Sequence, residues 1–191
     1  MKLRNVIAAL GMVSVAGPVM MAAMPAAIAD TATVVQQRRT IPDWDLGDDS
    51  CADVTIKSKA NNQYVAAEVE YGGYVFGQLR ARSGGAGAWE KFSICPQDGY
   101  QTLYSYGAQR YVSAEKNYTG ADKGMLRARA TSVASFEKFQ IVHNKAQGYY
   151  TIKSLVNGKY VSAELAYTGG GYAMLRARAD SVGDYEKFLI S

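Results

Sequence analysis

Apolar and polar residues alternate over short runs from about residue 51 onward, which is the pattern of half-buried β-strands. The clearest run reads Leu-Arg-Ala-Arg, with every second residue apolar, and it occurs at residues 79–82, 126–129 and 175–178. No stretch after residue 29 shows the 3.6-residue period of an amphipathic helix. The hydrophobic pattern therefore predicts an all-β protein.

Each of these runs belongs to a longer motif that occurs three times. Tyr-Val-x-Ala-Glu precedes the run, beginning at Tyr64, Tyr111 and Tyr160, and an aromatic residue followed by Glu-Lys-Phe comes after it. The tyrosine and the leucine lie 15 residues apart in every copy, and successive copies lie 47 and 49 residues apart. Constant spacing of this kind indicates an architecture built from copies of one unit.

Every copy contains four predicted strands. The second strand surrounds Tyr-Val-x-Ala-Glu, the third is the Leu-Arg-Ala-Arg run, and the fourth begins at Glu-Lys-Phe. The first strand is predicted at 54–58, 102–106 and 150–154. Residue pairs typical of tight turns lie between the first two strands of the copies, at Asn61-Asn62, Gly107-Ala108 and Asn157-Gly158.

Three four-stranded units without a fourth copy predict a β-trefoil, in which six strands form a short barrel and three hairpins close one end of it. A propeller needs at least four blades, and a β-helix has a shorter period. The repeats are expected at about 51–98, 99–147 and 148–191. The predicted core consists of four sets of symmetry-related residues: Leu79, Leu126, Leu175; Phe92, Phe139, Phe188; Ile94, Ile141, Ile190; and Val65, Val112, Val161.

The first 29 residues are predicted to be a signal peptide. Lys2 and Arg4 precede an apolar segment, and Ala27 and Ala29 supply the small residues of a signal-peptidase site. An uncleaved membrane anchor is the alternative, but prolines interrupt the segment, which barely reaches the roughly 20 apolar residues of a span. We expect a secreted protein cleaved after Ala29, with residues 30–50 as a flexible acidic leader.

Charge and cysteine content narrow the possible partners. Residues 51–191 carry 17 basic and 12 acidic side chains, a net charge of +5 that is too small to indicate nucleic-acid binding but allows an acidic polysaccharide. Two cysteines in an exported chain predict a disulfide, and a trefoil would bring Cys51 and Cys95 together on neighbouring strands. A metal site would need further ligands, and the only histidine is His143. We expect no metal and no cofactor.

The repeat resembles that of the fascin-like, actin-cross-linking type of β-trefoil. The resemblance is carried by Tyr-Val-Ser-Ala-Glu, the Leu-x-Ala strand and aromatic-Glu-x-Phe, and it covers about residues 51–191. It implies the trefoil fold. Fascins bundle actin through several such trefoils, whereas this chain has one behind a predicted signal peptide, so the resemblance implies an accessory sugar-binding domain rather than a cytoskeletal one.

The loops between the second and third strands carry the candidate ligand site. Three symmetry-related tyrosines lie there beside glycines, and two further tyrosines break the symmetry: Tyr71, Tyr118, Tyr167; Tyr74, Tyr172. A tyrosine offers a flat apolar face with a polar hydroxyl, which suits stacking and hydrogen bonding to a sugar. The alternative is that these tyrosines merely cover the open end of the barrel.

The repeated charged residues have structural and functional interpretations. Six arginines of the third strands either form solvated cross-strand ion pairs with Glu68, Glu115 and Glu164 or bind sulfated or carboxylated sugars. These candidate anion ligands are Arg80, Arg82, Arg127, Arg129, Arg176 and Arg178.

A second set of acids, Glu90, Glu137 and Glu186, is expected to hydrogen-bond backbone in its own turns rather than to form a glycosidase pair.

No catalytic constellation is visible. His143 has no acid close by in sequence, and no nucleophile elbow, phosphate-binding loop or dinucleotide fingerprint occurs. The Gln-x-Trp signature of ricin-type lectins, another trefoil family, is also missing. The sequence therefore predicts a monomeric, non-catalytic module without nucleic-acid or, after cleavage, membrane partners. An extracellular glycan is the expected ligand, and a protein-interaction module, including a protease inhibitor, is the alternative.

Overall fold

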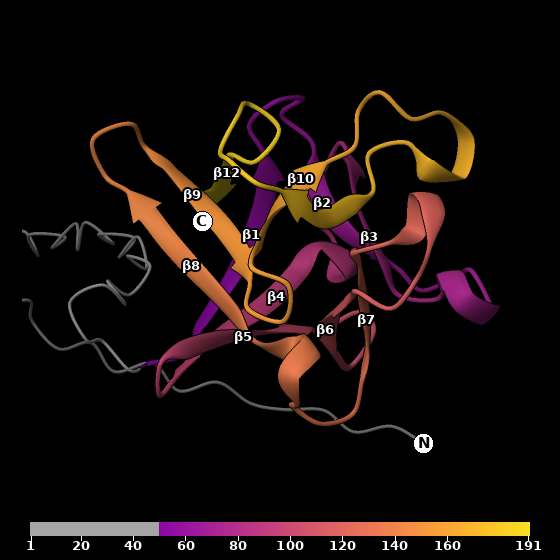
Figure 1. The fold of residues 1–191 in the computed structure, drawn as a ribbon, viewed down its shortest axis with the longest axis horizontal. Helices are drawn as coiled ribbons and strands as arrows, with labels where there is room; N and C mark the ends of the chain where they lie inside the picture. The colour runs from indigo at the N-terminus through magenta and orange to yellow at the C-terminus, as the bar shows by residue number, and fades with distance from the viewer. Residues whose placement is uncertain (1–49) are drawn as a thin grey trace, which may run out of the picture. The chain divides into compact units, whose positions relative to one another are not determined.

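The structure is a computed structural model in which residues 50–191 are described. These residues form twelve strands: β1 (Ala52–Ser58), β2 (Tyr64–Glu68), β3 (Gln78–Ser83), β4 (Lys91–Gln97), β5 (Tyr100–Ser105), β6 (Arg110–Glu115), β7 (Met125–Ala130), β8 (Phe139–Asn144), β9 (Tyr149–Ser154), β10 (Lys159–Ala163), β11 (Leu175–Ala179) and β12 (Phe188–Ile190) (Figure 1). Short 3-10 turns lie in the connections: η2 (Gly73–Val75), η3 (Ala88–Glu90), η4 (Gly120–Asp122), η5 (Ser135–Glu137) and η6 (Gly169–Gly171). We call β1–β4 unit 1, β5–β8 unit 2 and β9–β12 unit 3.

The strand pairing defines a β-trefoil. β1, β4, β5, β8, β9 and β12 pair antiparallel in a closed cycle, which makes a six-stranded barrel. The remaining strands form three hairpins, β2–β3, β6–β7 and β10–β11, each with a bulge after its first tyrosine. The hairpins contact one another through β3, β7 and β11. The predicted all-β trefoil of three four-stranded repeats is confirmed.

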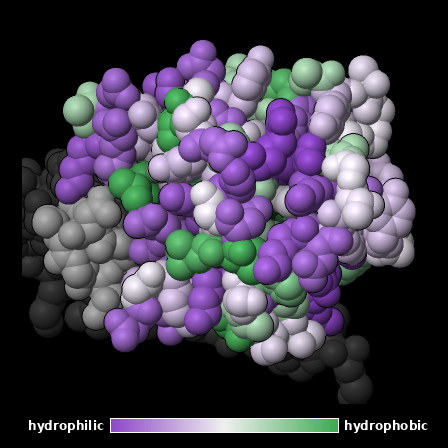
Figure 2. Space-filling model, in the orientation of Figure 1, coloured by the Kyte–Doolittle hydropathy of each residue, from purple (hydrophilic) through white to green (hydrophobic). Residues whose placement is uncertain are grey.

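The core lies where the repeat placed it. All twelve predicted core residues are buried, and the three phenylalanines of the Glu-Lys-Phe motifs have no exposed surface. The buried residues of all three repeats form one hydrophobic cluster, so the repeats share a single core. Hydrophilic side chains predominate on the face drawn in Figure 2, and apolar ones form small separate patches there, which is ordinary for a protein surface.

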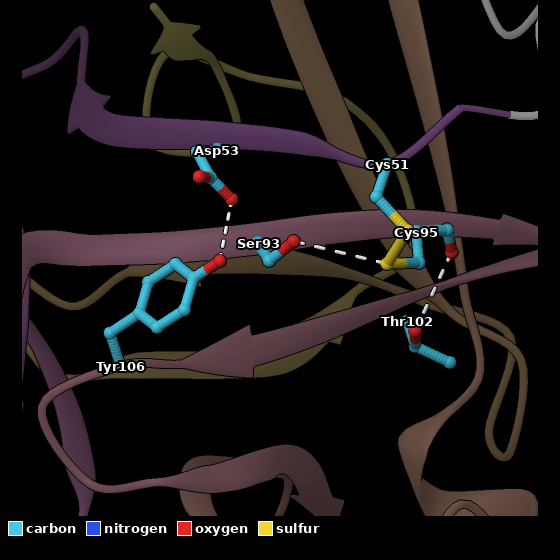
Figure 3. The surroundings of a disulfide bond; sticks show 6 residues. All are labelled: Cys51, Asp53, Ser93, Cys95, Thr102 and Tyr106. Atoms are coloured by element: carbon cyan, nitrogen blue, oxygen red, sulfur yellow. Dashed lines mark hydrogen bonds between the residues drawn. A yellow bond between two sulfur atoms is a disulfide. The ribbon is translucent and has the colours of Figure 1, made fainter.

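A disulfide joins the start of β1 to β4. Cys51 and Cys95 are bonded, with their Cα atoms 4.2 Å apart, as the trefoil topology predicts (Figure 3). The bond spans 44 residues of sequence, and in the chain-entropy model a loop of that length is stabilised by about 4 kcal/mol. Close by, the Tyr106 hydroxyl donates a 2.6 Å hydrogen bond to Asp53, and this contact raises the pKa of the phenol.

Two predictions fall largely or wholly outside the described residues: the signal peptide at 1–29 and the acidic leader at 30–50, of which only Ser50 is described. Within 50–191 no helix is long and apolar enough to cross a bilayer. The same part of the chain contains no cluster of three or more side chains suited to hold a metal ion.

Candidate functional site

The hairpin loops that carry the predicted tyrosines project on the same side of the barrel (Figure 1). Each loop joins the two strands of its hairpin and contains one 3-10 turn: η2 in unit 1, η4 in unit 2 and η6 in unit 3. Neighbouring hairpins meet along three contacts, which we call seam 1–2 (β3 with β7), seam 2–3 (β7 with β11) and seam 3–1 (β11 with β3). The candidate site lies among these loops and seams.

A buried arginine crosses every seam and holds the loop of the neighbouring unit. At seam 1–2, Arg127 donates from Nε to the Phe76 carbonyl at 3.0 Å and from Nη2 to the Gly73 carbonyl at 3.4 Å. The equivalent bonds run from Arg176 to Lys123 and Gly120, and from Arg80 to Tyr172 and Gly169. Since unit 2 holds unit 1, unit 3 holds unit 2 and unit 1 holds unit 3, the three contacts form a closed ring.

Tyrosine hydroxyls complete this contact at two seams only. Arg127 donates from Nη1 to the Tyr118 hydroxyl at 2.7 Å, and Arg176 does the same to Tyr167 at 2.8 Å. Both tyrosines are half-buried. In unit 1, Tyr71 is 47% exposed and instead accepts a 3.3 Å hydrogen bond from Arg82. Arg80 therefore lacks the tyrosine that its two counterparts have.

The second arginine of each strand is held by a buried glutamate. Arg82 donates to both carboxylate oxygens of Glu68, at 2.5 and 2.7 Å, and this hydrogen bonding raises the pKa of the guanidinium. Equivalent bidentate pairs join Arg129 to Glu115 and Arg178 to Glu164.

The expected cross-strand ion pairs are present, but they are only partly solvated: Glu68, Glu115 and Glu164 are 7%, 5% and 4% exposed, whereas their arginine partners remain partly exposed. The first arginines, Arg80, Arg127 and Arg176, are buried as well and donate to backbone. We therefore do not propose the six arginines as an anion-binding collar.

The acids of the Glu-Lys-Phe motifs have a structural role. Glu90 accepts a 2.7 Å hydrogen bond from the Gly87 amide, and Glu137 and Glu186 accept equivalent bonds from Ala134 and Gly183. The expectation that each acid bonds backbone in its own turn is confirmed. His143 stacks on Tyr150 with ring centroids 4.2 Å apart.

One seam differs from the other two at a single backbone position. Gly77 and Gly124 have positive φ, and their carbonyls accept hydrogen bonds across seams 1–2 and 2–3. A Cβ on Gly77 would lie 2.2 Å from a carbonyl oxygen, and one on Gly124 2.5 Å. Ala173 occupies this place in seam 3–1, with φ 58° and its methyl fully buried. The Ala173 carbonyl still accepts the equivalent hydrogen bond, from the Ala81 amide at 2.8 Å, so seam 3–1 keeps the backbone contact of the other two. What distinguishes it is the space above it, and we therefore call it the open seam and the other two the closed seams.

A cavity of about 660 Å³ lies over this seam. Of the five predicted tyrosines, Tyr71, Tyr74 and Tyr167 line it. The other two, Tyr118 and Tyr172, do not. The glycine-only turn η6 forms one wall and contributes no side chains, whereas unit 1 has Tyr74 and Val75 at the equivalent places.

Two polar residues of the cavity, Gln78 and Asp122, were missed by the sequence reasoning, whereas Arg80, which also lines it, was among the candidate anion ligands. Burial, followed by the nearby charge of Arg82, lowers the pKa of Arg80. The available signal was a departure from the repeat, since Gln78 stands where the other copies have Met125 and Met174.

No family model and no curated protein matches the chain. Solved structures do match it. A designed threefold-symmetric protein, ThreeFoil, aligns with a TM-score of 0.60 and 18% identity over 72% of this chain and 96% of its own. The ricin B-like lectin of Macrolepiota procera, solved with lactose, aligns at 0.58 and 13% over 73% and 94%. An exo-β-1,3-galactanase from Clostridium thermocellum aligns at 0.59 and 13% over 72% of this chain, which spans only 29% of that enzyme.

These likenesses show the trefoil fold.

Proposed function

We propose that this chain is a secreted, non-catalytic trefoil module of fascin-like type that binds an extracellular glycan in the cavity over seam 3–1. The observation that carries the proposal is the convergence of Tyr71, Tyr74 and Tyr167 on one cavity of about 660 Å³ that also contains polar side chains. Small-ligand sites are typically concave, about 300–1,000 Å³ in volume, and lined by aromatic residues with a few polar groups. A sugar stacks on aromatic rings through its C–H face and forms hydrogen bonds to polar groups through its hydroxyls.

The surface of the tyrosines suits this ligand. Tyr74 is 63% exposed and Tyr71 47% exposed, so both rings offer a face to a ligand instead of filling the core. The neighbouring trefoils add support at the level of fold alone, since one is a lectin solved with lactose and another belongs to a galactanase.

The acids give no support to a catalytic role. Glu90, Glu137 and Glu186 are each held by a backbone amide, and a glycosidase needs carboxyl groups that face the scissile bond. Glu68 is likewise bound on both oxygens by Arg82, and Asp122 is the one carboxylate among the described residues that line the cavity, so it has no acidic partner there. We therefore assign binding and no hydrolysis to the domain.

Retention of the purified protein on a panel of insoluble polysaccharides tests the proposal. The matched pair is Tyr167→Ala with Tyr118→Ala, because both remove the same hydroxyl–arginine contact but only Tyr167 lines the cavity. A second pair is Tyr74→Ala with Tyr185→Ala, two exposed tyrosines of which only the first lines the cavity.

We expect retention by wild type and by both control variants, and loss of retention in Tyr74→Ala and Tyr167→Ala. If the folded wild-type protein binds no glycan, the proposal is wrong and a protein partner becomes the target. If Tyr118→Ala and Tyr185→Ala lose as much as their partners, the site lies elsewhere on the surface.

A further inference from the structure

The floor of the cavity contains a polar residue where the repeat has an apolar one. Gln78, Met125 and Met174 are symmetry-related and 6%, 0% and 2% exposed. The Gln78 amide donates from Nε2 to the Met174 sulfur at 3.2 Å. A thioether is a weak acceptor, and burying an amide without a good partner is unfavourable. A polar group of a ligand above the floor would satisfy this amide.

A second polar group comes from the arginine of the open seam. Arg80 is 5% exposed and lines the cavity. Its Nε and Nη2 donate to the Tyr172 and Gly169 carbonyls at 2.8 and 3.0 Å. At the equivalent nitrogen Nη1, Arg127 and Arg176 donate to a tyrosine hydroxyl. Within residues 50–191, Nη1 of Arg80 makes no such bond, so this donor remains for a ligand.

The third group is a carboxylate from the loop of unit 2. Asp122 lines the cavity, whereas unit 1 has Val75 and unit 3 has Gly171 at this place. Across the described part of the chain, the half-buried Asp122 carboxylate forms no side-chain hydrogen bond or ion pair. It is an acceptor facing the same space as Arg80.

The charges of the lining residues Arg80, Arg82 and Asp122 sum to zero once Glu68, the partner of Arg82 outside the lining, is included. Arg82 is already neutralised by Glu68 through two hydrogen bonds. This leaves the positive Arg80 and the negative Asp122, with the neutral amide of Gln78 on the floor. A carboxylated or sulfated sugar would meet the carboxylate of Asp122, and an aliphatic ligand would leave all three polar groups unpaired. A sugar hydroxyl both donates and accepts hydrogen bonds. Neighbouring hydroxyls of one sugar can therefore donate to Asp122 and accept from Arg80 and Gln78.

We infer that the cavity over seam 3–1 takes a neutral sugar unit, with its hydroxyls bound by Gln78, Arg80 and Asp122 and its ring against Tyr74. This inference rests on the proposed function and names its ligand class. It also makes the site single, because Gln78, Asp122 and the unoccupied nitrogen of Arg80 each occur at one place in the threefold pattern.

Calorimetric titration with two matched pairs of soluble oligosaccharides tests the ligand class. The pairs are α-1,4-linked galacturonate oligomers and their neutral methyl esters of one length, and β-1,4-linked glucose and glucuronate oligomers of one length. We expect one site per chain and binding of at least one neutral oligomer about tenfold or more tighter than its acidic counterpart, which is the effect of one charge-assisted contact.

Two variants assign the polar contacts. Gln78→Met restores the residue of the other repeats, so we expect it to fold and to bind the neutral oligomer about tenfold more weakly, as for the loss of one hydrogen bond. Asp122→Asn should weaken neutral binding while strengthening binding of the acidic oligomer, because it removes the repulsion. Asp98→Asn, an exposed acid in the turn after β4, is the matched control and should bind like wild type.

The outcomes separate this inference from the proposed function. Tighter binding of the acidic oligomers, or wild-type affinity in both Gln78→Met and Asp122→Asn, overturns the neutral-sugar site. Retention on polysaccharides that still depends on Tyr74 would then keep the proposed function intact. Absence of binding to every oligomer and every polysaccharide by the folded wild-type protein overturns both.

Discussion

Seams 2–3 and 3–1 are built from the same motif but differ in how many of their polar groups have hydrogen-bond partners. At seam 2–3, Gly124 lets the strands approach closely, and Arg176 donates to two carbonyls and to the Tyr167 hydroxyl. At seam 3–1, Ala173 replaces the glycine, and Arg80 has two carbonyl partners and no tyrosine. The first seam has satisfied its polar groups internally. The second has space and unused donors, which are what a ligand needs.

The comparison indicates how a repeat protein acquires a site. Threefold contacts hold the hairpins together, so stability resides in the positions that all units share. Binding capacity arises where one copy departs from the others, because a departure leaves a group whose symmetric partner is missing. Substitutions at positions that all three units share should therefore mainly reduce stability. Substitutions at positions unique to one unit should mainly reduce ligand binding.

The largest expected effect is at the closed seams. Gly77→Ala should destabilise the fold by about 3 kcal/mol or more, because its methyl would lie 2.2 Å from the Ala128 carbonyl oxygen at a positive φ. Urea denaturation monitored by circular dichroism measures the change. Ala173→Gly is the matched substitution at the open seam, where relief of the left-handed conformation (about 1–2 kcal/mol) and the flexibility of glycine (about 0.5–1 kcal/mol) nearly cancel.

A loss of stability in Ala173→Gly as large as that in Gly77→Ala would contradict the view that only the glycine positions of seams 1–2 and 2–3 exclude a side chain.

The next effect concerns the arginines. Arg127→Leu should cost about 3 kcal/mol, because it leaves two buried carbonyls and the Tyr118 hydroxyl without their donor. Arg80→Leu should cost about 1 kcal/mol less, since among the residues that the structure describes Arg80 has neither the tyrosine partner of Arg127 nor an ion pair like the 3.9 Å contact of Arg127 with Glu115. The difference is measured by the midpoints of urea unfolding, provided that the two variants have the same m-value. Equal losses would show that the tyrosine hydroxyl contributes nothing to the contact.

The sequence was sufficient for the fold but not for the site, and the reason is the range of the contacts. The spacing of the motif predicted the core at Phe92 and the pairing of Cys51 with Cys95, because both follow from strand order within the repeat. The alternation in Leu-Arg-Ala-Arg placed Arg80 on the face opposite the core, which suggested exposure. That face is covered by the next unit, and alternation within one strand carries no information about such a neighbour.

The tyrosines show the same limit. Symmetry predicted that Tyr71, Tyr118 and Tyr167 would act alike. Only Tyr118 and Tyr167 share the contact with a buried arginine, and only Tyr71 and Tyr167 line the cavity. The departure at Gln78 was visible in the aligned copies, but its consequence depends on the hairpins meeting at the axis. Departures from a repeat were therefore readable from the sequence, and their meaning required the packing.

A smaller effect has the opposite sign. Gln78→Met should raise the free energy of unfolding by about 1 kcal/mol, because it removes a buried amide whose partner is a thioether. The reciprocal change, Met125→Gln, should lower it, since Met125 is fully buried at the closed seams. Thermal unfolding of both variants gives the comparison. A destabilised Gln78→Met would mean that the amide already has a good partner in the free protein.

The smallest effect separates the tyrosines by their hydroxyl groups alone. Tyr118→Phe and Tyr167→Phe each remove the acceptor of a buried arginine at 2.7 and 2.8 Å, so each should cost about 1 kcal/mol. Tyr71→Phe removes an exposed 3.3 Å contact with an arginine that Glu68 already holds, and it should cost less than about 0.5 kcal/mol. Urea unfolding of the three variants, measured side by side under the same conditions, resolves this difference in unfolding free energy. If Tyr71→Phe costs as much as the other two, its hydroxyl must turn toward Arg80 in solution. Seam 3–1 would then be closed like its neighbours, without a donor left for a sugar.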